Sequence, residues 1–547
     1  MNIKKKILRY VYGFGILLMR LFILPFGLFK IYKKSRSSDE PVGPIPGPSE
    51  IIINANIVEA EIDPFVYGNF IEVLGKCIYG GIWDEYNPQV PLVHGGIRQD
   101  VLEEIRPLKV TVLRWPGGCF SDVYEWKEGI GPRPQRKYQK NKHWHWLGPK
   151  FGPKHDNHFG SDEFMTLIEE IGAEPYININ FGSGTVEEAA QWVEYMNGDE
   201  TTEYGRLRAI NGHPKPYNVK IWGIGNELYL PTEVGFLDAA AYGKRYLEFV
   251  EAMRAVDPTL KFVAVGADFI EPEWNHTVLK TAGPAIDYLS LHVYIPQLLI
   301  ESLQNNVKDY YNIIAGAFEI DRRIKWVENT ILEAMGEQNR IPISFDEWGP
   351  WWNMRQLYEG YYTLRDGIFA ASVFEIFHRN ANTVKMANYA QLVNVIPMIV
   401  TNDTDVYHNP IYLAALLFAQ HAEKYRLASE VKCDSRQNAP YGNIQETIFP
   451  YLGCSATINA EKNKLIIIGI NRHHAHALPT TISIKHFTPT STAQVYELNA
   501  PSHSAYNNFH QKNEVRIHEK TYSPISNQFE YTFPAHSVTV LILQKIP

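Results

Sequence analysis

Two glutamates in this sequence of 547 residues each follow a short apolar run. Glu227 comes after Ile221-Trp-Gly-Ile-Gly225 and Asn226, and Glu347 follows Ile343-Ser-Phe-Asp346. An acid at the end of a buried strand lies where parallel α/β barrels keep their catalytic groups. Two such carboxyl groups can cleave a glycosidic bond, one as the proton donor and the other as the nucleophile or base. The alternative is two surface glutamates that merely follow buried strands.

The elements that would position these acids alternate between strand and helix from about residue 51, a pattern typical of βα units around a parallel sheet. We count eight candidate strand ends, the number that a closed (β/α)8 barrel, or TIM barrel, needs. They lie at 69–72, 112–114, 177–180, 224–227, 263–266, 289–292, 344–347 and 384–387. Between them, Thr185 and Glu188 predict a capping box, and Ser161 is a candidate helix cap.

The last part of the chain has a different pattern. After about residue 400, short alternating runs separated by turn residues predict an antiparallel β-sandwich. We therefore expect an α/β protein with a catalytic barrel over residues 51–398 and a sandwich over residues 399–547. The first strand of the barrel region is one that the two domains could share.

Residues 1–36 form a basic and apolar segment of their own. The apolar run 10–29 is long enough to span a membrane, but Arg20 lies at its centre, where a charge is costly. We interpret the segment as an uncleaved signal-anchor or an interfacial helix, which would make the protein membrane-anchored or exported. The alternative is a basic extension or a mis-assigned start, on a cytoplasmic protein. Residues 37–50, rich in Ser, Pro and Gly, predict a linker.

Composition excludes some classes of partner. A net charge of −8 and an isoelectric point near 6.2 provide no basic field, so we expect no nucleic acid partner. The 12 Trp and 32 Tyr favour a surface on which sugar rings stack. Four cysteines are too few for a disulfide scaffold and have no metal-binding spacing.

Two groups of histidines raise the question of a metal site. The insert 131–159 carries four histidines, but Trp residues are interposed and no acid or Cys cluster accompanies them. His473, His474 and His476 lack partners at zinc spacing. We predict no metal in either group. The insert would be a loop over a substrate groove or a plain surface loop, and the second group an exposed turn.

Eight short motifs follow one another from about residue 51 to the C-terminus. They are Tyr67-Gly-Asn-Phe-Ile-Glu72 with Gly75-Lys-Cys-Ile-Tyr-Gly-Gly81, Leu113-Arg-Trp-Pro-Gly-Gly118, Gly225-Asn-Glu227, Ser290-Leu-His-Val-Tyr294, Phe345-Asp-Glu-Trp348, Asn388-Tyr-Ala-Gln-Leu-Val-Asn394, Gly469-Ile-Asn-Arg472 and Pro534-Ala-His-Ser-Val-Thr-Val540. In this order they resemble the α-L-arabinofuranosidases of glycoside hydrolase family 51. The resemblance implies a barrel with the acid/base on strand 4 and the nucleophile on strand 7. It also implies retention of configuration, release of terminal arabinofuranose from arabinan, arabinoxylan or their oligosaccharides, no cofactor, and a homo-oligomer.

The matching motifs imply roles for the residues around the two acids. Glu227 would be the acid/base and Glu347 the nucleophile. Arg114 would keep Glu347 ionised, Tyr294 would orient it, and His292 would lie beside it. For Arg114 the alternative is a purely structural ion pair.

Other matching residues would bind the sugar. Asn226 would contact the 2-hydroxyl, and Glu72 and Gln391 would bind other furanose hydroxyls. For the last two, the alternative is a satisfied polar group under the barrel rim. Trp348, with the nearby Trp351 and Trp352, would stack on the sugar of the leaving group or, alternatively, pack in the core.

The sequence departs from the family pattern at Cys119, where many members have Asn. A thiol is a weaker hydrogen-bonding group than the amide expected to touch the sugar, which affects fine specificity more than the class of reaction. Asp122 could compensate for the missing amide. A bridge between Cys77 and Cys119 is conceivable.

Two rival functions remain. A related barrel endo-β-1,4-glucanase or xylosidase would use the same glutamates with a differently shaped pocket. A non-catalytic surface protein that binds carbohydrate would keep the barrel as a scaffold, but the retention of Glu227, Glu347, Arg114, Asn226 and Tyr294 speaks against it.

Overall fold

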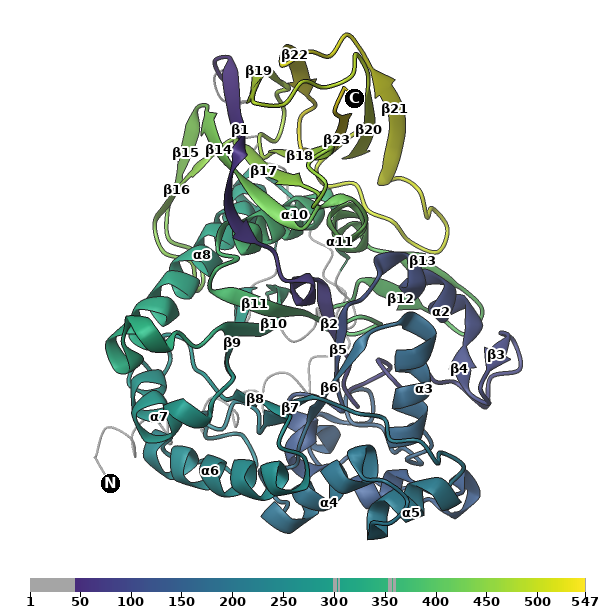
Figure 1. Cartoon of the computed structure of the whole chain (residues 1–547). Coiled ribbons are helices and arrows are strands. Elements are labelled where there is room, and N and C mark those ends of the chain that lie inside the picture. Colours follow the sequence, from purple (N-terminus) through teal and green to yellow (C-terminus); the bar gives the residue numbers. More distant parts are fainter. Residues whose placement is uncertain (1–44, 299–302, 304, 353–356, 358–360, 547) are drawn as a thin grey trace.

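The computed structural model describes residues 45–298, 303, 305–352, 357 and 361–546 (Figure 1). The predicted apolar segment 10–29 and the linker as far as residue 44 lie outside these ranges. Within them, no helix is long and apolar enough to cross a bilayer.

Eight parallel strands close into a barrel, which confirms the predicted fold class. In chain order they are β2 (Gly68–Phe70), β5 (Val112–Trp115), β6 (Glu174–Asn178), β7 (Ile221–Ile224), β8 (Lys261–Ala264), β9 (Tyr288–Pro296), β10 (Ile343–Trp351) and β11 (Val384–Ala390). Each predicted strand end lies on one of these strands or directly after it. Glu227 therefore follows the fourth strand, and Glu347 lies in the seventh.

Helices cover the outside of the barrel, as Figure 1 shows. They are α2 (Gln99–Ile105), α3 (Ser161–Ile171), α4 (Val186–Asn197), α5 (Glu203–Ile210), α6 (Ala239–Val256), α7 (Trp274–Ala282), α8 (Val307–Met335) and α10 (Leu364–Arg379), followed by α11 (Pro410–His421). The inside of the barrel is filled by side chains from five strands, which form a cluster separate from that of the helix layer: Val112, Tyr176, Ile221, Val263 and Met386.

Local signals fix where two of these helices begin. The capping box before α4 is confirmed, because Thr185 Oγ1 accepts from the Glu188 amide and Glu188 Oε2 accepts from the Thr185 amide. The prediction that Ser161 caps α3 is wrong, since Gly160 is the N-cap and the Ser161 hydroxyl accepts from Trp192 Nε1. A Cβ on Gly160 would lie 1.7 Å from the Gly129 carbonyl oxygen, so only glycine fits there.

The C-terminal part of the chain forms a nine-stranded sheet that folds back on itself as the predicted sandwich. The hydrogen-bonded order is β21 (Arg516–Tyr522), β20 (Ala493–Asn499), β23 (Ser537–Gln544), β18 (Lys464–Asn471), β17 (Leu452–Ile458), β14 (Tyr425–Lys432), β1 (Ser49–Glu61), β19 (Leu478–Lys485) and β22 (Gln528–Phe533). The edge strand β22 reaches over β18, where a Cβ on Gly469 would touch the Phe533 ring. β1 comes from the start of the barrel region, and it pairs with β14 and β19.

The strands of this sheet carry apolar side chains on both faces, and one face packs towards the barrel. In β18, Leu465 and Ile467 belong to the sandwich core, whereas Ile466 and Ile468 belong to the large core around the barrel. Successive side chains of a strand point to opposite faces, so a strand with apolar residues on both faces is buried on both. The inner sheet face thus packs on α10 and α11 (Figure 1).

Three shorter pairs of strands lie outside the barrel and the nine-stranded sheet: β3 (Leu92–Val93) with β4 (Ile97–Arg98), β12 (Ile399–Thr401) with β13 (Val406–His408), and β15 (Ser435–Asn438) with β16 (Thr447–Pro450). The prediction of an exposed turn around His473 is wrong. His473 and His474 are buried, and His474 Nδ1 lies 2.9 Å from the Tyr311 hydroxyl of α8. These histidines therefore help to join the sandwich to the barrel.

Candidate active site

The two predicted catalytic glutamates come together at the C-terminal end of the barrel. Glu227 lies in the turn after β7 with a φ of 45°, a backbone conformation that costs a residue with a side chain about 1–2 kcal/mol. A carboxylate oxygen of Glu227 and one of Glu347 lie within 4.8 Å of each other. Retaining glycosidases hold their carboxyl groups about 5–5.5 Å apart, and inverting enzymes roughly 6.5–9.5 Å. The separation fits retention.

Both carboxylate oxygens of Glu347 accept hydrogen bonds. Arg114 Nη1 donates to Oε1 at 2.6 Å, and the Tyr294 hydroxyl donates to Oε2 at 2.7 Å. Arg114 Nη2 also donates to Asn226 Oδ1 at 2.8 Å. Because Arg114 is almost fully buried, its charge acts on Glu347 with little screening by solvent. Arg114 and Tyr294 thus fix the orientation of the Glu347 carboxyl group.

His292 lies between the two glutamates. Its Nδ1 is 2.9 Å from Glu227 Oε1 and 3.7 Å from Glu347 Oε1, and its Nε2 is 3.3 Å from Asp346 Oδ1. Burial lowers the pKa of His292, but the Glu347 charge, the contact with Asp346 and the hydrogen bond with Glu227 outweigh burial and raise it to about 10. The ring therefore carries a proton at neutral pH and donates to Glu227.

Asp346 is a site residue that sequence reasoning missed. Although burial raises the pKa of Asp346, the Arg114 charge and the contact with His292 hold it at about 2. The Tyr176 and Ser290 hydroxyls donate to its two oxygens at 2.7 and 2.6 Å. Asp346 is thus a permanent negative charge beneath the site, which keeps His292 protonated.

A bulge in β10 explains how two consecutive acids reach the same side. The register against β9 shifts between Ser344 and Glu347, and the register against β11 shifts between Phe345 and Trp348. Regular alternation would send Asp346 and Glu347 to opposite faces, whereas a bulge can re-aim one side chain. The pair Asp346-Glu347 was visible in the sequence, but the bulge was not.

Glu72 is the centre of a hydrogen-bonded group at the ends of β2 and β11. Its Oε1 accepts from the Phe120 amide at 2.9 Å and from Trp144 Nε1 at 3.1 Å, and its Oε2 accepts from Gln391 Nε2 at 3.2 Å. Burial is the main cause that raises the pKa of Glu72 to about 7. Trp144 belongs to the insert 131–159, so this insert reaches the catalytic face, as one of its two predicted interpretations required.

The Pro116-Gly-Gly turn after β5 brings backbone against the catalytic group. A Cβ on Gly118 would lie 2.6 Å from Glu347 Oε1 and 3.2 Å from Asn226 Oδ1. Cys119 follows at the start of η3 (Cys119–Val123), and Asn226 Nδ2 lies 3.6 Å from its sulfur. Cys119 therefore lies beside the candidate sugar-binding amide.

Two expectations about Cys119 are corrected. Asp122 does not compensate for the missing amide, because it is buried and its oxygens accept from the backbone amides of Phe181, Gly182 and Asn226. Cys119 and Cys77 are both free thiols, so they form no bridge.

The structure does not bring Trp348 to the sugar site. This side chain is 1% exposed and packs edge-on against Phe374 and Phe377 of α10 and against Tyr389 of β11. Following Glu347 in β10, it points outward to the helix layer. The alternative of core packing holds for Trp348, while Trp351 lies edge-on to Tyr294, with ring centroids 5.3 Å apart.

A closed (β/α)8 barrel with this pair of carboxyl groups at its C-terminal end defines a glycoside hydrolase. Comparisons with known proteins identify its family. Residues 104–312 match the alpha-L-arabinofuranosidase 1 domain, and residues 346–537 match the alpha-L-arabinofuranosidase C-terminal domain. The chain belongs to the α-L-arabinofuranosidases of glycoside hydrolase family 51, as relatives and solved structures also show.

Among relatives, the intracellular exo-alpha-L-arabinofuranosidase of Bacteroides ovatus is 33% identical over 90% of this chain and 95% of its own length. The probable alpha-L-arabinofuranosidase C of Aspergillus clavatus is 32% identical, with 90% and 96% covered. The alpha-L-arabinofuranosidase of Thermotoga maritima, solved as an arabinose complex, superposes with a TM-score of 0.83 at 35% identity, covering 91% of this chain and 100% of that one. The resemblance seen in the sequence is confirmed.

Proposed function

We propose that this protein is a retaining, exo-acting α-L-arabinofuranosidase that releases terminal arabinofuranosyl residues from arabinan, arabinoxylan or their oligosaccharides. One observation carries the retaining mechanism: carboxylate oxygens of Glu227 and Glu347 lie within 4.8 Å of each other. The sugar is proposed from the family and from the relatives named above. Exo action is supported by the Bacteroides ovatus relative, which is an exo-alpha-L-arabinofuranosidase.

In the first step, Glu347 attacks the anomeric carbon and forms an ester bond to the sugar. Glu227 gives its proton to the glycosidic oxygen, which leaves as the alcohol of the remaining chain. The hydrogen bonds from Arg114 and Tyr294 support Glu347 as the nucleophile, because they hold its carboxyl group in one orientation.

In the second step, Glu227 acts as a base and takes a proton from water. The water oxygen bonds to the anomeric carbon, and Glu347 leaves as a carboxylate. Two inversions at the same carbon restore the original configuration. His292, at 2.9 Å from Glu227, orients this carboxyl group through both steps.

The sugar would lie over the polar side chains that surround the pair. Asn226 would bind the 2-hydroxyl, a contact that strengthens in the transition state. Glu72 and Gln391 would bind other hydroxyls, and Gln391 Oε1 has no hydrogen-bond partner among the described residues. An unpaired buried acceptor is costly, so a sugar hydroxyl that donates to it would bind favourably.

Release of arabinose from an aryl α-L-arabinofuranoside, branched arabinan and arabinoxylan oligosaccharides tests the proposal. Proton NMR of the first product should show the α anomer before mutarotation. Hydrolysis of carboxymethyl cellulose without release of arabinose would instead support the glucanase alternative. Binding of arabino-oligosaccharides without turnover would support the non-catalytic alternative.

A further inference from the structure

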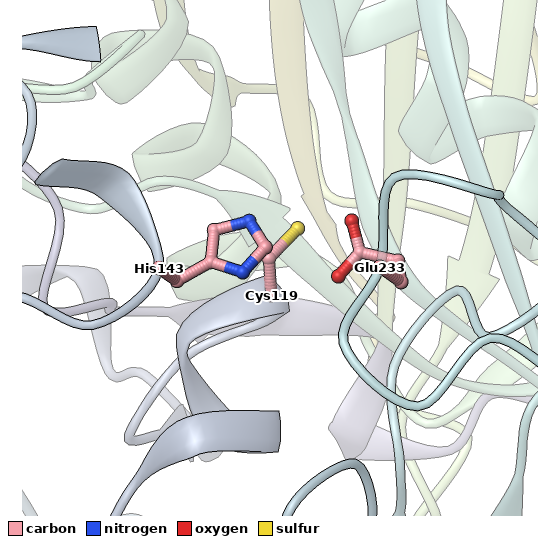
Figure 2. A group of neighbouring side chains, drawn as sticks. All are labelled: Cys119, His143 and Glu233. Atoms are coloured by element: carbon pink, nitrogen blue, oxygen red, sulfur yellow. The ribbon is translucent and has the colours of Figure 1, made fainter. Parts of the chain in front are cut away.

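Cys119, His143 and Glu233 form a second cluster beside the catalytic pair. Cys119 begins η3 after β5, His143 directly precedes η6 (Trp144–Leu147) in the insert, and Glu233 lies between β7 and α6. One potential ligand atom from each residue lies within 4.8 Å of the other two. Figure 2 shows the Cys119 sulfur between the His143 ring and the Glu233 carboxylate.

Two atoms of this cluster are buried without a hydrogen-bond partner. His143 is 7% exposed and Glu233 is 8% exposed. Neither His143 Nδ1 nor Glu233 Oε2 has a hydrogen-bond partner in the described part of the chain. Buried polar atoms in native proteins are nearly always paired, so an unpaired nitrogen and an unpaired oxygen beside one thiol indicate a missing ligand.

The types of side chain in the cluster, a thiol, an imidazole and a carboxyl group within 4.8 Å of one another, favour a cation as that ligand. Burial raises the pKa of the Cys119 thiol, and the charges of Glu233 and Glu227 raise it further. Burial and the Glu227 charge also raise the pKa of Glu233. His143 is neutral at pH 7, because burial lowers its pKa to about 4, and a neutral imidazole is the form that binds metal. Burial thus disfavours a free thiolate and a free carboxylate at this place, and a bound dication would stabilise both.

We propose that Cys119, His143 and Glu233 bind a thiophilic divalent cation such as Zn²⁺. A thiolate, an imidazole and a carboxylate are ligands that zinc prefers, and three protein ligands leave one tetrahedral position open. Bonds of about 2.0–2.3 Å place such ligand atoms roughly 3.5 Å apart, so the distances within the cluster, which are at most 4.8 Å, have to shorten by up to about 1.3 Å. The bonds to sulfur, nitrogen and oxygen form as the Cys119 thiol, and Glu233 where it is protonated, release protons to solvent.

The bound cation would inhibit the enzyme, a consequence that rests on the proposed function. Cys119 Sγ lies 3.6 Å from Asn226 Nδ2. A metal bound to this sulfur would compete with the Asn226 amide for it and so disturb the side chain that we expect to bind the sugar. Its positive charge beside Glu227 would also oppose proton transfer to the leaving group. The site would therefore be regulatory or inhibitory, and no catalytic step is assigned to it.

Titration of the full-length, metal-free protein with Cd²⁺ tests binding without any reference to catalysis. Cadmium replaces zinc at such sites, and a thiolate ligand gives an ultraviolet charge-transfer band. We expect one Cd²⁺ per chain with this band in the wild type. Cys119→Ser should lose the band. His143→Gln and Glu233→Gln should each weaken Cd²⁺ binding by at least roughly 10–100-fold, which is the usual effect of removing a residue that only orients a metal ligand.

Matched controls separate this cluster from other thiols and histidines. Cys433→Ser removes a half-buried thiol elsewhere, and His145→Gln removes a histidine two residues from His143, so both variants should bind Cd²⁺ like the wild type. Circular dichroism checks that each variant is folded. Because three ligand variants are tested, the test still works if one of them misfolds.

Two results would overturn the metal site: a wild type that gives no band, or a band that persists in Cys119→Ser. Inhibition of arabinofuranoside hydrolysis by Zn²⁺ is measured separately, and we expect at least a tenfold weaker effect in Glu233→Gln. A protein that binds Cd²⁺ but never releases arabinose would contradict the proposed function and leave the metal site standing.

Discussion

Arg114 donates one hydrogen bond to Glu347 and another to Asn226, at 2.6 and 2.8 Å, from the two terminal nitrogens of a single guanidinium. The candidate nucleophile and the candidate ligand of the 2-hydroxyl are thereby held by one rigid group. Lysine has a single ammonium group and not a planar guanidinium, so it could keep the positive charge but could not donate to both partners in these fixed directions.

Arg114→Lys should therefore lower kcat while leaving the protein folded. Loss of one hydrogen bond to a charged group costs about 1.5–3 kcal/mol, which corresponds to roughly a 10–100-fold lower rate. Arg254→Lys, at a half-exposed pair with Asp287, is the control and should keep wild-type kcat. If Arg114→Lys and Arg254→Lys have the same kcat, the ion pair between Arg114 and Glu347 is purely structural.

The two glutamates should respond differently to replacement. Glu347→Ala should abolish turnover of every substrate, because no nucleophile remains. Glu227→Ala should lower the rate on arabinan oligosaccharides by roughly 10²–10⁴-fold, the usual contribution of a general acid. On aryl arabinofuranosides with good leaving groups, the rate of the first step should fall far less. Burst kinetics measures this rate. An equal loss on both kinds of substrate contradicts the division of roles.

Burial of Glu72 should make stability depend on pH. The folded pKa of about 7 is above the ordinary 4.5, so the folded protein binds this proton more tightly than the unfolded chain. The resulting stability is fully present below pH 4.5 and is lost as the pH rises through about 7. Relative to Glu72→Gln, the free energy of unfolding of the wild type should fall by up to about 3 kcal/mol over this range.

Urea unfolding at several pH values measures this difference. Glu251→Gln, on the exposed face of α6, is the control, and its difference from the wild type should not change with pH in this way. A constant difference between the wild type and Glu72→Gln would show that Glu72 has the same pKa in the folded protein as in the unfolded chain, and would contradict the prediction.

Trp348 should matter for stability rather than for the sugar. Removal of a large buried aromatic ring costs about 3–5 kcal/mol, so Trp348→Ala should lower Tm by several degrees or more. Trp146→Ala, which removes a ring that is 38% exposed, should have little effect on Tm. A conservative Trp348→Phe variant that unfolds normally but has a strongly raised KM would restore the prediction of a stacking subsite.

The fold and the catalytic pair could be predicted because their signals are local. Each strand end is a short apolar run that stops at a polar residue, and Glu227 and Glu347 stand at two such ends. The role of Asp346 depends on a bulge, which leaves no mark in the sequence. The burial of His474 depends on how the sandwich packs against α8, a contact between distant segments.

The second cluster was missed for a related reason. The insert that carries His143 has no acid or cysteine cluster of its own, so spacing alone argued against a metal. Cys119 and Glu233 arrive from two other loops, 24 and 90 residues away along the chain. Ligands that meet only when the barrel closes cannot be recognised from spacing within one segment.

The position of β1 has a consequence for how the molecule is made. This strand leaves the ribosome first among the described elements, yet its partners β14 and β19 are synthesised more than 360 residues later. Until then its backbone donors and acceptors have no sheet to join, and an unpaired strand is a route to aggregation. The first described strand therefore stays unpaired until most of the chain has been synthesised.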